Sequence, residues 1–228
     1  MKNLSKEKPL HEVLKERSLL KQNVYISVKE KFEEFKQNIH EICNELKENV
    51  KEEKVRTFIE EKGSFESHLY VGSDVLVFNM HSNIFLFPDE SAIRKTSYVK
   101  ERNDRAYCGV INVYNFLADS FLHSRLNDPG YLLARIFIND EGHFLVEGKG
   151  KLGFLYRDFM HNEFTKAKQK EIIEHTIRQA AEFDLLTPPY EVVNQVSVMQ
   201  IQAHRSEQKM KTGKRLGFQF GAHNKEIK

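Results

Sequence analysis

The sequence predicts an α+β protein: an antiparallel sheet of about eight to ten short strands packs against N-terminal helices and one late helix. Residues 28–50 place apolar side chains at alternating spacings of three and four, which is the pattern of a helix that buries one face. From residue 55 onward the apolar period becomes two, as in half-buried strands. Seventeen Phe and eight Tyr without any Trp indicate an aromatic core, as expected for a sheet.

The first third of the chain is predicted to be helical. Pro9, followed by apolar residues among charges, indicates a short amphipathic helix to about residue 21. Ser27 and Glu30 form a capping-box pattern, so a second helix is expected to begin there. Its nearly heptad-regular stripe allows packing on the sheet, which we favour, or a homodimer through residues 28–50. We expect a helical segment at 1–54 and an α+β domain at 55–228.

Four short runs of β-branched and aromatic residues follow, at 55–61, 65–71, 75–80 and 84–87, separated by Gly, Ser and Asn. They predict a meander of antiparallel strands. Residues 88–105 are polar and begin with a Pro-Asp pair, so an irregular surface excursion is expected there.

The segment from 106 to 156 is predicted to hold further strands. Residues 107–113 alternate, and 115–122 change to a helical turn. Residues 131–138 and 143–147 form a hairpin in which Gly142 takes a positive φ. A strand is expected to continue through 154–156, a helix to span 166–183, and strands to return at 192–201 and 216–220.

A short glycine phrase occurs twice, at residues 150–154 (GKLGF) and 213–218 (GKRLGF). Backbone N–H groups beside glycine, with Lys149 and Lys151 nearby, are suited to binding an anion. The spacing of a Walker loop is absent. The alternative, which we favour, is that the glycines mark a bulge or a place where aromatic side chains from a neighbouring strand lie over the backbone.

The C-terminal segment is basic, with seven Lys and Arg against two Asp and Glu at 205–228. Its cations predict weak, salt-sensitive attraction for nucleic acid or an acidic protein partner. A solvated loop leading to a core strand is the alternative. The candidate anion-binding residues of this segment are Arg205, Lys209, Lys211, Lys214 and Arg215.

One pattern indicates catalysis. Glu147 and Lys149, together with Asp74, resemble the acidic-x-lysine centre of restriction-endonuclease-like nucleases. That resemblance, which covers three residues, implies two carboxylates holding a divalent ion and a lysine that helps to activate water.

No two histidines have the i, i+4 spacing of a helical metal site, so no other metal site and no cofactor is expected. Cys43 and Cys108 are expected to be buried thiols.

No apolar run in the sequence is as long as a bilayer span, and the lysine-rich start is not followed by the apolar stretch of a signal peptide. We therefore expect a cytoplasmic protein without a membrane partner.

Four segments, at residues 107–116, 135–139, 147–149 and 212–218, are similar to a group of uncharacterised bacterial conserved hypothetical proteins. The similarity spans most of the chain after residue 55 and implies no activity. The leading hypothesis is a non-enzymatic binding protein that engages a protein or nucleic acid through its sheet and basic C-terminal segment. The alternative is a metal-dependent nuclease-like hydrolase.

Overall fold

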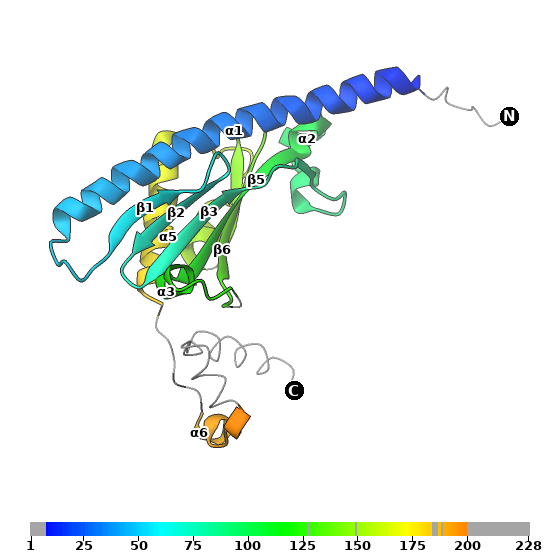
Figure 1. Cartoon of the computed structure of the whole chain (residues 1–228). Helices are drawn as coiled ribbons and strands as arrows, with labels where there is room; N and C mark the ends of the chain where they lie inside the picture. Colours follow the sequence, from blue (N-terminus) through cyan, green and yellow to red (C-terminus); the bar gives the residue numbers. More distant parts are fainter. Residues whose placement is uncertain (1–7, 127, 149, 184–186, 188, 200–228) are drawn as a thin grey trace.

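The computed structural model describes residues 8–126, 128–148, 150–183, 187 and 189–199. It confirms the α+β class, the antiparallel sheet and the packing of an N-terminal helix and a late helix against it (Figure 1). The elements in order are α1 (Leu10–Asn49), β1 (Thr57–Glu61), β2 (Glu66–Val71), β3 (Asp74–Met80), β4 (Phe85–Leu86), η1 (Ala92–Lys95), α2 (Ser97–Glu101), η2 (Asn103–Ala106), β5 (Tyr107–Leu117), α3 (Ala118–Leu122), β6 (Tyr131–Ile138), β7 (Phe144–Gly148), α4 (Gly150–Leu155), α5 (Lys166–Ala181) and α6 (Tyr190–Val193).

The two expected N-terminal helices are one helix, α1, of 40 residues. The predicted break fails because no Gly or Pro lies between residues 21 and 27, and because Val24 and Val28 are both fully buried on the same face. Ser27 does not cap a helix. It lies inside α1, where its hydroxyl donates to the carbonyl oxygen of Asp140 at 3.2 Å.

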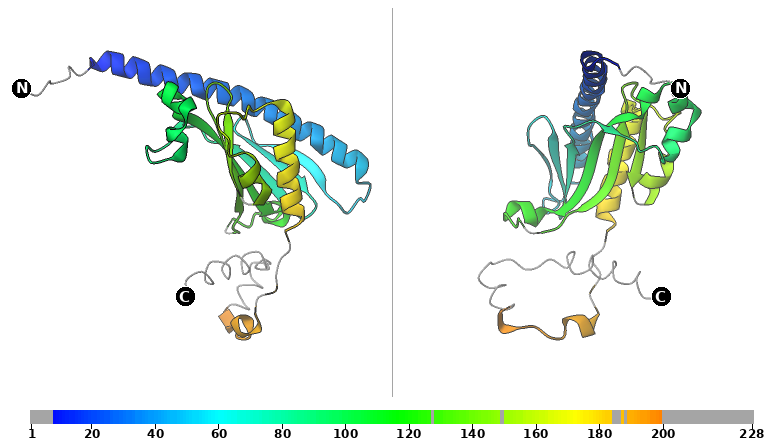
Figure 2. Two further views of the ribbon diagram at one scale, coloured as in Figure 1. Left: turned by 180° about the vertical axis from the view of Figure 1, so that it is seen from behind. Right: turned by 90° about the vertical axis from the view of Figure 1, so that its right-hand side faces the viewer.

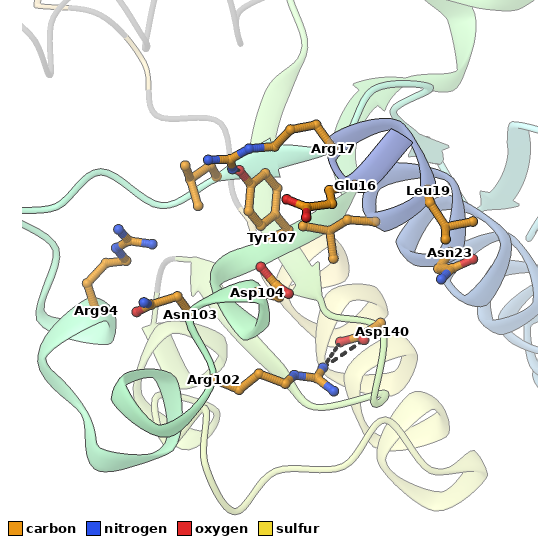
Figure 3. Close-up of a pocket in the computed structure, with 12 residues that line it drawn as sticks. Glu16, Arg17, Leu19, Asn23, Arg94, Arg102, Asn103, Asp104, Tyr107 and Asp140 are labelled. Atoms are coloured by element: carbon orange, nitrogen blue, oxygen red, sulfur yellow. Dashed lines mark hydrogen bonds and ion pairs between the residues drawn. The ribbon is translucent and has the colours of Figure 1, made fainter. Parts of the chain in front are cut away.

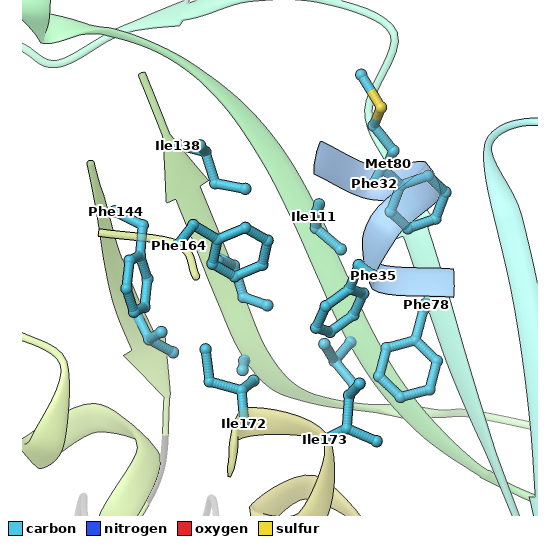
Figure 4. Close-up of a cluster of buried hydrophobic side chains, with 14 of the residues drawn as sticks. Phe32, Phe35, Phe78, Met80, Ile111, Ile138, Phe144, Phe164, Ile172 and Ile173 are labelled. Carbon is cyan, nitrogen blue, oxygen red and sulfur yellow. The ribbon is translucent and has the colours of Figure 1, made fainter. Parts of the chain in front are cut away.

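The core lies between the sheet and the two long helices. Phe35 of α1 is fully buried, with its ring 5.6 Å from both Phe78 and Phe164 (Figure 4). Ile172 and Ile173 of α5 complete the same cluster. The apolar stripe of α1 is therefore used within the chain, and a homodimer through residues 28–50 would have to expose this core. The N-terminal part of α1 extends past the sheet (Figure 2).

The sheet has the strand order β1-β2-β3-β5-β6-β7, with β4 pairing with one end of β5, and every pairing is antiparallel. The predicted hairpin is present between β6 and β7, where Gly142 has a φ of 80°. The predicted helical turn after β5 is α3. The described residues hold seven strands where eight to ten were expected.

Two expected strands are helices. Residues 150–155 form α4, in which Leu152 is 1% exposed, as is Tyr156 four residues later. Residues 190–193 form α6. The expected strand at 216–220 and the second glycine phrase lie outside the described residues.

The second face of the sheet carries two separate apolar clusters. At one end, α3 covers a cluster that includes Tyr70 and Val75. At the other end, the predicted excursion forms η1, α2 and η2, and it covers a cluster that includes Cys108, Val110 and Phe137. Between these two clusters, the middle of this face is partly exposed to solvent.

A network of polar groups ties the excursion to the β6–β7 hairpin. The Tyr98 hydroxyl donates to Glu141 at 2.5 Å and accepts from the Asn139 amide at 2.9 Å. The Arg105 guanidinium donates to Glu141 at 3.0 Å and lies 4.2 Å from the centre of the Tyr98 ring. Burial and the hydrogen bond to Glu141 raise the pKa of the Tyr98 hydroxyl, so it stays a donor at neutral pH.

No helix in the described ranges is long and apolar enough to cross a bilayer. Cys43 and Cys108 are both buried free thiols, as predicted.

Candidate functional site

A row of polar side chains crosses the middle of the second sheet face. Its members face one another from strand to strand in register, and they are Glu66, Asn79, Asn112, Arg135 and Glu147. The Asn79 amide donates to Glu66 at 3.0 Å, and Arg135 forms an ion pair with Glu147. This polar row separates the two apolar clusters described above.

A cavity of about 400 Å³ adjoins the polar row. We call it the β4 pocket. Its floor is made by Cys108, Val110 and Phe137, and its wall by the segment 85–88 that contains β4. Asn112, Arg135, Glu147 and His81 line its polar end.

The wall of the β4 pocket presents apolar groups to solvent. Phe85 is 42% exposed and Leu86 is 45% exposed, although both line the cavity. The Phe85 ring packs edge-on against His81 with ring centres 4.8 Å apart. Phe87, in contrast, is nearly buried and lies 5.1 Å from the Phe137 ring. An apolar cavity with a few convergent polar groups is the usual form of a binding site.

The polar end of the β4 pocket contains a side-chain amide that is not hydrogen-bonded to any described residue. Asn112 is half-buried, and its side-chain amide makes no hydrogen bond to any described residue. It therefore offers both a donor and an acceptor. Arg135 is neutralised by Glu147, and Glu66 adds another acidic group to the row. The polar row carries no excess of positive charge.

Cys108 is the nucleophilic group in the pocket floor. It is 1% exposed, and burial raises the pKa of its thiol. A thiol in such a position is protonated at neutral pH and packs as an apolar group.

The structure does not bring together the carboxylates of the nuclease-like pattern. Asp74 is on β3 and Glu147 on β7, with β5 and β6 between them, so three strand spacings, about 14 Å, separate them across the sheet. Asp74 shares the face of Leu76 and Glu147 the face of Leu145, and these faces are opposite. Asp74 instead accepts a hydrogen bond from the Asn115 amide at 3.0 Å.

Lys149 lies outside the described residues, as do Arg205, Lys209, Lys211, Lys214 and Arg215. Lys151 is described and exposed on α4. Among the described residues there is no group of three or more His, Cys, Asp and Glu placed to hold a metal ion.

The glycines of the first phrase have a structural cause. Gly150 has a φ of 60°, which reverses the chain between β7 and α4. A Cβ on Gly153 would overlap the carbonyl group of Gly148. The helix thus lies directly against the end of the strand. The glycines permit a close backbone approach between a strand and a helix, where a bulge or aromatic side chains over the backbone had been expected.

A second cavity, of about 650 Å³, lies under the N-terminal part of α1 (Figure 3). Most of its charged groups already have partners. Arg102 contacts both carboxylate oxygens of Asp140 at 2.7 Å, Glu16 pairs with Lys8 at 2.7 Å, and the Arg17 guanidinium donates to the Tyr107 hydroxyl. The Arg17 contact joins α1 to β5, and the Arg102 pair joins the excursion to the β6–β7 hairpin, so we treat this cavity as structural.

No protein-family model, curated protein or solved structure matches this chain.

The sheet was predicted to be a binding surface, but the residues of the β4 pocket were not predicted. A signal for them was present. Asn79, Asn112 and Arg135 each interrupt an apolar strand run with one polar residue on three neighbouring strands. Their alignment depends on strand order and register, which the sequence did not supply.

Proposed function

We propose that this protein is a non-enzymatic binding protein that holds an apolar segment of a protein partner in the β4 pocket. The observation that carries the proposal is the combination of an apolar floor with the side-chain amide of half-buried Asn112, which makes no hydrogen bond to any described residue. A side chain of the partner would fill the pocket, and a neighbouring peptide group would bond to Asn112. Anchoring by one buried side chain is how many protein interfaces obtain most of their affinity.

The charge of this face favours a protein over nucleic acid. Nucleic-acid surfaces carry clustered Lys and Arg to neutralise phosphates. The polar row has one arginine and two glutamates, and the arginine is already paired. A phosphate backbone laid across this row would meet more repulsion than attraction.

The basic segment at 205–228 is the second part of the proposal. Its seven Lys and Arg against two Asp and Glu would attract a partner with an acidic surface. The partner class that satisfies both features is an acidic protein with an exposed apolar segment. The alternative, a nuclease-like hydrolase, needs Asp74 and Glu147 at one ion, and their strands and faces argue against it.

Site-specific photo-crosslinking in cells tests the proposal. The full chain would carry a photoreactive benzoylphenylalanine in place of Phe85, in the pocket wall, or in place of Phe154, which is 73% exposed on α4. We expect a protein adduct from position 85 and none of the same mass from position 154. Asn112→Leu should reduce the yield at position 85, because it removes the amide.

Two outcomes would contradict the proposal. An adduct at position 85 that nuclease treatment removes would show that nucleic acid occupies this face. Equal adducts from positions 85 and 154 would show that the β4 pocket has no preference for a partner.

A further inference from the structure

A cavity of about 500 Å³ lies where the start of α4 meets the end of α5. We call it the Lys151 cavity. It shares no lining residue with the β4 pocket. Its basic lining residues are Lys151 from α4 and His175 and Arg178 from α5. The amide of Gln179 and one carboxylate, that of Glu182, also line it.

The basic groups of the Lys151 cavity are available to a ligand. Neither Lys151 nor His175 has an ion pair or a side-chain hydrogen bond with any described residue. Arg178 pairs with Glu182 at 3.7 Å, and both side chains are about two-thirds exposed. Such a long, solvent-exposed ion pair contributes little to stability. A ligand that accepts hydrogen bonds from Arg178 more strongly would therefore replace Glu182 as its partner.

The backbone at the mouth of the cavity is open. Gly150 lines it, and a Cβ at this position would meet no atom within 4 Å. Leu152 and Phe183 provide apolar wall on the other side, and Phe183 is 46% exposed. The cavity therefore combines three basic side chains with an apolar surface, in a volume larger than one small ion requires.

The number of cations indicates the class of ligand. One carboxylate is balanced by one cation, whereas a phosphomonoester carries a charge close to −2 at neutral pH and three acceptor oxygens. Arg, Lys and an imidazole that converge from two helices supply donors for those acceptors, and the two cations Lys151 and Arg178 outnumber the one carboxylate, Glu182, in the lining. We propose that the Lys151 cavity binds a small phosphomonoester with an apolar body, its phosphate held by Lys151, His175 and Arg178. This inference does not depend on the β4 pocket.

Calorimetric titration of the full chain with phenyl phosphate, inorganic phosphate and benzoate tests the proposal. Phenyl phosphate should bind most tightly, because it supplies both the dianion and the apolar body. Lys151→Gln and Arg178→Gln should each weaken its binding about tenfold, the usual size for a lost hydrogen bond between charged groups. Both residues are exposed, so these variants should fold.

The matched control is Lys168→Gln, on the same helix α5. Lys168 is ion-paired with Glu171 at 2.9 Å and does not line the cavity, so its loss should leave phenyl phosphate binding unchanged. Amide chemical shifts would locate the ligand, with the largest changes expected at Gly150, Lys151 and Gln179.

Several results would overturn the proposal. Unchanged affinity in Arg178→Gln, or shifts confined to residues 205–228, would place the phosphate elsewhere. Benzoate binding as tightly as phenyl phosphate would exclude recognition of a dianion. Tighter binding of a twelve-nucleotide oligothymidylate, lost in the same two variants, would assign the cavity to a nucleic-acid backbone.

Discussion

Two glycines of α4, Gly150 and Gly153, differ in what a methyl group would meet. At Gly153 a Cβ would overlap the backbone carbonyl of Gly148, which no side-chain movement can relieve. At Gly150 the same atom meets nothing within 4 Å, although φ is 60°. Gly153→Ala should therefore lower the free energy of unfolding by about 3 kcal/mol or more, and Gly150→Ala by about 1 kcal/mol.

Urea denaturation of both variants, followed by circular dichroism, checks this prediction. Equal losses in the two variants would mean that α4 can move away from Gly148 and that the close approach is not required.

Glu141 makes stability depend on pH. Burial alone would raise the pKa of this carboxyl, but the Tyr98 hydroxyl and the guanidinium groups of Arg102 and Arg105 outweigh burial and lower it. A carboxyl whose folded pKa is lowered stabilises the fold above its unfolded pKa, near 4.3. That contribution is lost as the pH falls through the folded value.

Glu141→Gln should accordingly be less stable than the wild type at pH 7, and the difference should shrink as the pH falls from about 5 toward 3. The urea midpoint measured at each pH is the readout. Glu48→Gln is the control, because Glu48 is exposed on α1 and has no ion pair within the described ranges. A difference between Glu141→Gln and wild type that stays constant with pH would show that the charge of Glu141 is not what stabilises the hairpin.

At the level of elements, one buried polar pair joins α1 to α5. The Asn38 amide donates to the Gln169 carbonyl oxygen at 2.6 Å, and the Gln169 amide donates to the Phe164 carbonyl at 3.0 Å. Asn38 is 2% exposed and Gln169 is fully buried. Loss of Asn38 would leave the side-chain oxygen of Gln169 without a donor, and loss of Gln169 would leave the Asn38 amide without an acceptor, in a buried site.

Asn38→Leu and Gln169→Leu should each destabilise by about 1–3 kcal/mol. The double variant should cost less than the sum of the two, because the second change removes the group that the first left unsatisfied. A double-mutant cycle from urea denaturation measures this coupling. Additive effects would mean that the two amides do not depend on each other.

The elements that sequence analysis identified correctly are those whose local pattern agrees with their environment. Residues 166–181 form a helix with Ile172 and Ile173 inward, and Thr165 caps it by accepting a hydrogen bond from the Lys168 N–H. Strands form between residues 57 and 80 as expected, although β2 and β3 are buried on both faces rather than on one. The break near Ser27 was wrong because Ser is tolerated inside a helix when its hydroxyl finds a tertiary partner, here the Asp140 carbonyl.

The strand predicted at residues 154–156 was wrong for a different reason, which the segment 150–156 shows. Their Phe and Leu favour a strand, but Leu152 and Tyr156 are spaced by four and both point into the core. That spacing indicates a helix. The preference of single residues was outweighed by burial against α5, which lies in another part of the sequence.

The candidate site could not be predicted from composition, because it depends on the order of the strands and on the sheet face to which each side chain points. Asp74 and Glu147 look equivalent in sequence, since each is an acidic residue on a strand. Side-chain alternation places them on opposite faces, and the strand order places them three strands apart. The same two facts align Asn112 with Arg135 and so create the polar end of the β4 pocket.

At the scale of the whole molecule, charge is divided along the chain. Residues 205–228 carry seven Lys and Arg against two Asp and Glu, whereas residues 1–204 carry 28 against 31. Removal of residues 205–228 should therefore abolish retention on heparin at low salt. It should leave the urea midpoint unchanged, because the described helices and strands lie between Leu10 and Val193. Undiminished retention would show that the anion-binding surface lies elsewhere in the chain.

The truncation also distinguishes the roles that the proposal gives to charge and to the β4 pocket. Long-range attraction raises the rate of encounter and is screened beyond about 8 Å at physiological salt. A side chain in an apolar pocket acts at contact and is insensitive to salt.

If the basic segment and the β4 pocket act on one partner, removal of residues 205–228 should reduce the crosslink at position 85 strongly at low salt and only weakly at high salt. Asn112→Leu should reduce that crosslink equally at both salt concentrations. A truncation effect that is the same at every salt concentration would mean that the segment contributes contacts of its own, and the electrostatic part of the proposal would be wrong.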